Sequence, residues 1–301
     1  RGRAARLEKE LYEKLKTYKA GLPKEEAEEI AAKTAQLLAY QEEPSTPEEL
    51  EAIPVLERED ILKEIAPVFN EEIYYDGTLM VHHDIETNGI GYVDLLFDLS
   101  AVPAEMLPYV GILQGVLGII DTTNYKYGEL FNEINVHTGG ISTSLEMYPD
   151  VTKVKEKEFK ATFEIKAKAL YNKLPAAFDM MKEILTESKL DDAKRLKEIL
   201  DMAISRIQMR FQSSGHTTAA LRAMAYASPL SKFKDMTNGI DYYKKVSEIA
   251  EHFDEEKETL IHNLKTLAKM LFRAENMIIS YTSSKEGLDG MEEIVKGLKQ
   301  S

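Results

Sequence analysis

The stretch EEIYYDGTLMVHHDIETNGIGYVDLLFDLS, residues 71–100, is the part of this chain that indicates its architecture most clearly. Its hydrophobicity alternates with a period of two, which is typical of strands that bury one face. Asp76-Gly77 and Asn88-Gly89 interrupt the alternation, and both dipeptides favour tight hairpin turns. We therefore predict a meander of three strands, near residues 72–75, 78–86 and 90–99.

The same alternation predicts which side chains of these strands face the core, because successive side chains of a strand point to opposite faces. The inward-facing residues of the second strand are predicted to be Leu79, Val81 and Ile85. Those of the third strand are predicted to be Val93, Leu95, Phe97 and Leu99.

Three side chains on the other face of the second strand could bind a metal. His82, Asp84 and Glu86 point the same way, and all three types are metal ligands. We favour a solvated strand face, because one strand rarely supplies a complete ligand set and no second cluster lies near it in the sequence. His83 falls on the apolar side and is interpreted as a core or subunit-facing histidine. An independent metal enzyme built on the first three residues stays open as an alternative.

The segment MLPYVGILQGVLGIID, residues 106–121, is predicted to be a helix that is apolar nearly all round. Gly111, Gly115 and Gly118 lie within it, although each interior glycine costs a helix about 1 kcal/mol relative to alanine. Their spacing of i, i+4 and i+7 places them on one stripe of the helix. We interpret this stripe as a surface on which a neighbouring element packs closely.

Strand and helix patterns follow one another in the rest of the chain. A second helix near residues 125–136 precedes two strands, GGISTSLEMY (139–148) and KEFKATFEIKA (157–167). AENMIISYTSS (274–284) is typical of a returning strand, and a terminal helix follows it. This order predicts an α+β fold, in which helices pack on one face of a mostly antiparallel sheet. Between these strands, helices are predicted at about 173–187, 190–212, 216–227, 239–252 and 255–271.

The N-terminal part is predicted to be a linker helical hairpin over residues 1–45, with one apolar stripe on each helix. These stripes must pack on something else, because two such helices have no core of their own. A connector rich in proline and glutamate follows at residues 46–54, and the α+β domain is predicted to span residues 55–301.

Composition excludes several classes of protein. The formal net charge is −14, which argues against nucleic-acid binding because phosphate recognition needs a positive field. There is no cysteine, so disulfides and cysteine-ligated metal sites are excluded. No apolar run reaches the ~20 residues of a membrane span. We expect a soluble protein of the cytoplasm, or of an organelle matrix in a eukaryote, with no membrane partner.

The segment SSGHTTAALRA, residues 213–223, brings serine, histidine and arginine together. Nucleophilic catalysis would also need an orienting acid and an oxyanion hole, and the sequence indicates neither. Ser214 is interpreted as the cap of a helix. The segment lacks the lysine of a phosphate-binding loop, and neither H-E-x-x-H nor H-x-x-E-H occurs in the chain.

Several motifs in order carry a family resemblance that covers essentially the whole chain. After the hairpin come IPVLEREDI (53–61), the long segment FDLSAVPAEMLPYVGILQGVLGIIDTTNYKYGELFNEINVHTGGIS (97–142), SSGHTTAALRAMAYASP (213–229) and GIDYYKKV (239–246). Together they resemble the middle section of presequence-protease-type zinc metalloendopeptidases, of the pitrilysin and insulinase superfamily. In that family two halves of similar fold close around a peptide, and a helical hairpin joins them.

The resemblance implies that this chain is the hairpin plus the non-catalytic third domain, with the other domains outside the sequence. The helix at 106–120 would occupy the position of the family's zinc-binding helix, but glycine, leucine and glutamine stand where ligands are required. No catalytic or metal-binding residue can therefore be carried over, and zinc is expected only in the parent protein. Place in the family-like motifs suggests four chamber-lining residues, namely His137, Gly139, Gly140 and Arg222.

The expected function is therefore that of a wall and linker in a peptide-degrading chamber. The expected partners are a peptide substrate and the missing catalytic domains, and the net charge of −14 would suit basic, presequence-like peptides. The alternative is a non-enzymatic structural or peptide-binding subunit of the same fold.

Overall fold

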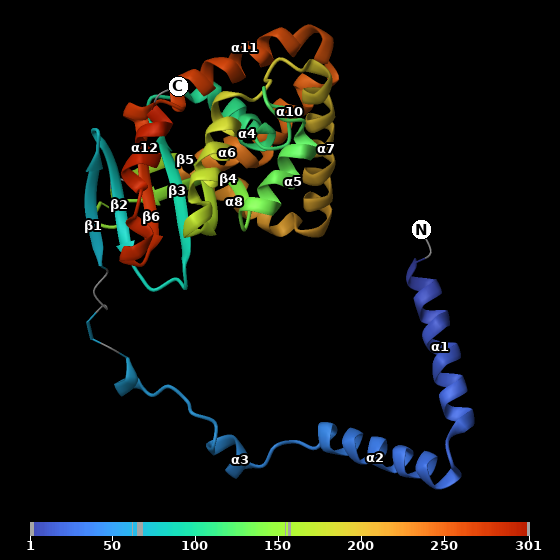
Figure 1. Ribbon diagram of the computed structural model, residues 1–301. Helices are drawn as coiled ribbons and strands as arrows, with labels where there is room; N and C mark the ends of the chain where they lie inside the picture. The colour runs from blue at the N-terminus through green and yellow to red at the C-terminus, as the bar shows by residue number, and fades with distance from the viewer. Residues whose placement is uncertain (1–2, 62, 65–68, 154, 156–157, 300–301) are drawn as a thin grey trace. The chain divides into compact units, whose positions relative to one another are not determined.

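The computed structural model describes residues 3–61, 63–64, 69–153, 155 and 158–299 (Figure 1). The chain separates into two compact units, Arg1–Ala66 and Pro67–Ser301. The expected boundaries after residues 45 and 54 both lie within the first unit, and the division into hairpin, connector and domain stays a prediction.

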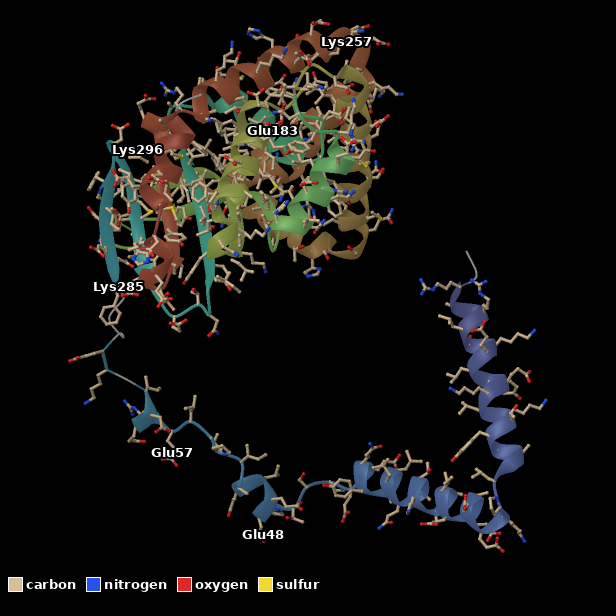
Figure 2. The ribbon with its side chains drawn as sticks, in the orientation of Figure 1. Glu48, Glu57, Glu183, Lys257, Lys285 and Lys296 are labelled. Atoms are coloured by element: carbon tan, nitrogen blue, oxygen red, sulfur yellow. The ribbon has the colours of Figure 1, made fainter. Side chains whose placement is uncertain are left out.

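The first unit consists of helices and connecting segments, and no described residue in it is buried. Its helices are α1 (Arg3–Gly21), α2 (Lys24–Glu42) and the short α3 (Pro47–Glu51). The predicted N-terminal helical hairpin is therefore confirmed, and its apolar stripes lie exposed, with Leu11 57% and Leu37 54% accessible. Figure 2 shows the side chains of Glu48 and Glu57 standing away from the ribbon of this unit.

The second unit contains one six-stranded sheet in the order β1-β2-β6-β3-β5-β4. Every neighbouring pair is antiparallel except β2 and β6, which run parallel. The predicted α+β fold with a mostly antiparallel sheet is confirmed. The strands are β1 (Asn70–Tyr75), β2 (Thr78–Asp84), β3 (Ile90–Asp98), β4 (Ile141–Pro149), β5 (Phe159–Leu170) and β6 (Met277–Ser283).

Both predicted turns form, but only one closes a hairpin. Asp76 and Asn88 adopt φ values of 50° and 52°, each followed by a glycine at positive φ. The first turn joins the paired strands β1 and β2. The predicted pairing of β2 with β3 is wrong, because β6 lies between them and bonds to both. A local turn signal cannot reveal a strand inserted from a distant part of the chain.

The predicted inner face is confirmed for β3 and wrong for β2. Val93 and Leu95 are buried as expected. In β2 it is Met80 and His82 that are fully buried, whereas Leu79 and Val81 are only partly buried. Because alternate side chains point to opposite faces, a strand interpreted one residue out of phase exchanges its whole inner and outer set.

Helices pack on the sheet face that carries these buried residues, and Figure 1 shows α4, α7, α10 and α11 gathered to the right of the sheet. The core between the two layers includes Phe163, Ile165 and Ile279, each fully buried. The sequence analysis missed α9, which begins after the Ser228 cap. The helices are α4 (Leu107–Val116), α5 (Tyr127–His137), α6 (Leu174–Thr186), α7 (Ala193–Ser213), α8 (Gly215–Met224), α9 (Pro229–Asn238), α10 (Ile240–Glu251), α11 (Phe253–Leu271) and α12 (Met291–Lys299).

Candidate functional site

The three glycines of the apolar helix have three different roles. A Cβ on Gly111 would overlap the carbonyl oxygen of Thr237, so α4 and α9 touch there through their backbones. Nothing lies within 4 Å of a Cβ built on Gly115, which opens onto a cavity. Gly118 adopts φ +84° just after the helix ends. The predicted packing stripe is therefore confirmed at the first glycine only.

Gln114 ties α4 to the edge strand β4. Its Nε2 donates to the carbonyl oxygen of Thr143 at 3.0 Å, and the Thr143 hydroxyl donates to the backbone oxygen of Gln114 at 2.9 Å. The two bonds hold the exposed edge of the sheet against the helix end. They also use the glutamine's donor group within the fold.

A zinc ion does not fit this helix. Gly111, Gln114 and Gly115 have the i, i+3, i+4 spacing of H-x-x-E-H, but none offers an imidazole or a carboxylate. The space beside the first of them is filled by the backbone of Thr237. No group of three metal-ligating side chains occurs among the residues that the structure describes.

Two cavities meet at Gln114 and Asn238, which line both of them. The first has a volume of about 330 Å³ and lies between α4 and α7, with Gly115 in its wall. The second has a volume of about 420 Å³ and runs beside β4, where Thr143 and Leu145 line it. Together they form a groove, here called the α4 groove, at the position where the resemblance would place a catalytic centre.

Three of the four predicted chamber-lining residues lie close together in the chain and in the structure. Gly139 donates its N–H to the carbonyl oxygen of Lys168 at 2.7 Å, and a side chain on it would meet the lysine stem. Gly140 adopts φ +121° and, with Gly139, lines a cavity of about 390 Å³ on the outer side of β4 and β5. His137 ends α5, where its Nδ1 lies 3.3 Å from the Lys173 amine. Their contact with a peptide stays a prediction.

Arg222 lies elsewhere and belongs to a structural ion-pair cluster. Its guanidinium donates to the carboxylate of Asp235, which is 1% exposed, and lies 2.8 Å from Asp241. The hydrogen bond to Asp235 raises the pKa of Arg222 above its usual value. Arg222 lines none of the three cavities above. Ser214 precedes α8, but its side chain makes no capping hydrogen bond.

The candidate metal ligands on β2 are used in other ways. His82 is fully buried, not solvated, and its Nε2 lies 3.1 Å from the carbonyl oxygen of Ser283. Asp84 lies 3.9 Å from the Lys285 amine. His83 is only partly buried, and its Nδ1 lies 2.6 Å from the side chain of Asn70, so the core interpretation of this histidine is wrong.

A buried polar cluster on the outer sheet face was missed by the sequence analysis. Glu164 is 1% exposed and accepts hydrogen bonds from Tyr148 and Thr162, both at 2.6 Å. The Lys166 amine lies 2.9 Å from its other oxygen. Burial raises the pKa of the neighbouring Asp94, and Lys166 offsets part of that rise. Alternation placed Glu164 opposite the core, and no local signal indicated that cross-strand neighbours would enclose it.

Comparison with known proteins agrees with these features. Residues 1–249 match the model of the family described as peptidase M16, subfamily C, associated. Protein HypA of Clostridium perfringens is 34% identical over 96% of this chain and 29% of its own length. Presequence protease 1, chloroplastic/mitochondrial, of Arabidopsis thaliana is 28% identical over 96% of this chain and 26% of its own length. The chain thus spans less than a third of these curated relatives.

The fold is also found in a solved structure. A conserved protein from Enterococcus faecalis V583 superimposes with a TM-score of 0.55, at 12% identity, over 77% of this chain and 52% of that one. Within the described part of the chain, no helix is both long and apolar enough to span a bilayer.

Proposed function

This chain belongs to the family associated with subfamily C of the M16 peptidases, and we propose that it is the non-catalytic segment of a zinc metalloendopeptidase that degrades peptides in a closed chamber. Its relatives include presequence proteases, so a role in a peptidase is the common starting point. The segment supplies a wall of the chamber and the linker between its two halves. The zinc ion and the catalytic groups belong to other domains of the parent protein.

One observation carries this proposal. The helix α4 has the sequence position and the residue spacing of a catalytic helix, yet the space beside Gly111 is filled by the backbone of α9, and Gln114 is bonded to Thr143. Such a helix can shape a surface, but it cannot activate water. The exposed apolar stripes of α1 and α2 support the linker role, because they are available to pack on other domains.

Electrostatics supports a basic peptide as the substrate. The net charge of −14 attracts Lys- and Arg-rich peptides over a distance, and salt screens this attraction. For the full-length parent, we expect the KM for a basic peptide to rise with ionic strength. A KM that does not change with salt would remove the electrostatic part of the proposal.

Site-directed crosslinking tests the chamber wall directly, because the chain contains no cysteine. A single cysteine at Ser142, which is exposed beside Gly140, should react with a bound peptide that carries a thiol-reactive group. The full-length parent, with its other cysteines replaced, is the protein to use. Lys257→Cys near the start of α11 is the matched control, because the Lys257 side chain reaches solvent (Figure 2) and lines none of the cavities described above. Equal labelling at both positions would contradict the proposal.

The alternative, a non-enzymatic subunit that binds peptides, makes a different prediction in the same material. A full-length protein that crosslinks peptides at Ser142→Cys without hydrolysing them would support it. We propose the cytoplasm, or an organelle matrix in a eukaryote, as the site of action.

A further inference from the structure

The α4 groove is positively charged in a chain that is strongly acidic overall. Arg206, Arg210 and Lys234 line its two cavities, and no aspartate or glutamate is among the described residues that do so. The whole chain carries 52 acidic and 38 basic residues, so a groove lined only by cations departs from the surrounding surface. Such a groove is complementary to an anion.

The two arginines lack a carboxylate partner. Arg210 donates to the side-chain and backbone oxygens of Asn238, at 3.0 and 2.6 Å, and both acceptors are neutral. Arg206 makes no hydrogen bond or ion pair with another described residue, and its side chain is exposed. They are four residues apart on α7, so their like charges face the same side and repel each other. An anion bound between them would relieve that repulsion.

The floor of the same cavity is apolar. Ile112, Ile199 and Ile207 are 2%, 4% and 5% exposed and line it together with Met202 and Ala203. Gly115 leaves room where any other residue would project a Cβ, since nothing lies within 4 Å of that position. A volume of about 330 Å³ accommodates one large apolar side chain.

Two side-chain amides stand where this cavity meets the second one. Gln114 uses its Nε2 on Thr143, and its Oε1 accepts no hydrogen bond from a described residue. Asn238 accepts from Arg210 through Oδ1, and its Nδ2 donates to no described residue. One acceptor and one donor are thus left over, which is the complement of one peptide bond.

From this geometry we infer that the α4 groove binds the carboxyl end of a peptide whose last residue is large and apolar. The charge and the apolar floor belong to one cavity, so the ligand must carry both on one residue. In an unmodified peptide only the C-terminal residue can combine an apolar side chain with a carboxylate. The carboxylate lies against Arg206 and Arg210, the last side chain enters beside Gly115, and the preceding peptide bond lies across Gln114 and Asn238.

This inference rests on the proposed function in one respect, which is that the ligand is a peptide. It also reconciles a cationic groove with a basic substrate, because even a Lys-rich peptide ends in one carboxylate. The second cavity, lined by Lys234 and β4, would receive the residues that precede the last one.

Direct binding to the 301-residue chain tests the inference. The probes are fluorescein-labelled basic peptides that end in Leu-COOH, in Leu-CONH₂ or in Gly-COOH. We expect the free acid with leucine to bind about tenfold or more tightly than the amide, since a charge-assisted hydrogen bond of ~1.5 kcal/mol corresponds to a tenfold change. Ending in glycine should also weaken binding, because the apolar cavity stays empty.

Variants separate the parts of the site. Arg206→Gln should reduce binding of the free acid to the level of the amide, and Gly115→Leu should abolish the preference for leucine over glycine. Lys257→Gln on α11 is the matched control and should bind as the unaltered chain does. Circular dichroism reports whether each variant is folded, and Arg206→Gln is on the exposed face of α7, where folding does not depend on it.

Three results would overturn the inference. They are equal binding of acid and amide, no effect of Arg206→Gln, and equally tight binding of an amidated peptide with an internal Asp-Leu pair, which would indicate an acidic side chain as the ligand. Absence of all peptide binding to the chain also overturns it, while hydrolysis by the full-length parent would still support the proposed function. Conversely, a parent that hydrolyses no peptide removes the proposed function and leaves the measured preference for the free acid intact.

Discussion

Gly111 and Thr237 are in backbone contact: a Cβ on Gly111 would overlap the carbonyl oxygen of Thr237, and it would also lie 2.8 Å from the Tyr242 ring. The helix that resembles a catalytic helix is thereby locked against α9 through its own main chain. Where the family's catalytic half would need a metal ligand, this chain needs the smallest residue. The contact explains why a glycine is retained in a helix interior despite its conformational cost.

Alanine at the two glycines of α4 should have opposite effects. Gly111→Ala should lower the free energy of unfolding by about 1–3 kcal/mol, because the added methyl group must displace the backbone of α9. Gly115→Ala should raise it by up to about 1 kcal/mol, because the methyl group meets nothing and the helix loses a flexible residue. Urea unfolding of both variants measures the difference, and effects of the same sign would contradict this account of the two positions.

Replacing Arg222 should destabilise the fold, whatever it does to peptide binding. Arg222→Ala leaves the buried carboxylate of Asp235 without its guanidinium partner, and an uncompensated buried charge is strongly unfavourable. The midpoint of thermal unfolding should fall clearly. Lys257→Ala is the control: its partner Asp254 is 97% exposed, so the change should stay within about 0.5 kcal/mol. An unaltered midpoint for Arg222→Ala would return this residue to the list of chamber-lining candidates.

Glu183 should make stability depend on acid pH. Burial alone would raise its pKa, but hydrogen bonds from Thr122 and Asn124 outweigh burial and hold the pKa below its usual value. A carboxyl whose pKa is lower in the folded state stabilises the protein above its unfolded pKa, and that stabilisation is lost as the pH falls through the folded value. Glu183→Gln should therefore cost about 1.5–3 kcal/mol at neutral pH and much less in acid.

Chemical unfolding at several pH values measures this difference, and Glu48→Gln is its control. The Glu48 side chain lies in solvent in the first unit (Figure 2), so that variant should behave as the unaltered chain does at each pH. A penalty for Glu183→Gln that stays constant down to strongly acidic pH would show that its hydrogen bonds do not depend on the charge of the carboxylate.

Tyr148 should make stability depend on alkaline pH. Burial, the hydrogen bond to Glu164 and the negative charge of that carboxylate raise the pKa of the Tyr148 hydroxyl above its usual value. A tyrosine whose pKa is raised in the folded state stabilises the protein below its unfolded pKa, and this contribution is lost as the pH rises toward the folded value. Tyr148→Phe should cost about 1 kcal/mol at neutral pH, since solvent screens part of the bond.

The penalty for Tyr148→Phe should shrink once the pH exceeds about 10, the usual pKa of tyrosine. Tyr12→Phe on α1, where the ring is 64% exposed, controls for the loss of any tyrosine hydroxyl. Equal penalties for the two variants would argue against a specific bond between Tyr148 and Glu164.

Elements whose signal is local were predictable. The turn at Asp76-Gly77 depends on two residues that tolerate positive φ, and it forms where expected. Likewise β3 and β5 show clear alternation and bury the predicted side chains, such as Leu95 and Phe163. The family resemblance was predictable for a similar reason, because its motifs are contiguous runs of residues.

The candidate site was predictable only in part. Gly139 and Gly140 do line a cavity, and their pairing was visible in the sequence. Arg222 looked equally suitable, but its role depends on Asp235, which comes from another helix. Nothing in the order of residues states which of several acidic groups an arginine will meet.

Three features therefore follow from the order of residues alone: the class of fold, the helices and strands with strong periodicity, and the lack of the residues that a zinc site on α4 would require. Other features emerge only when the chain folds, namely the place of β6 between β2 and β3, the burial of His82, and the cavity that Arg206 and Arg210 share with Gly115. The physical reason is the range of the interactions. Periodicity and turn preference act over a few neighbouring residues, whereas strand order, burial and shared cavities depend on contacts between segments that are distant along the chain.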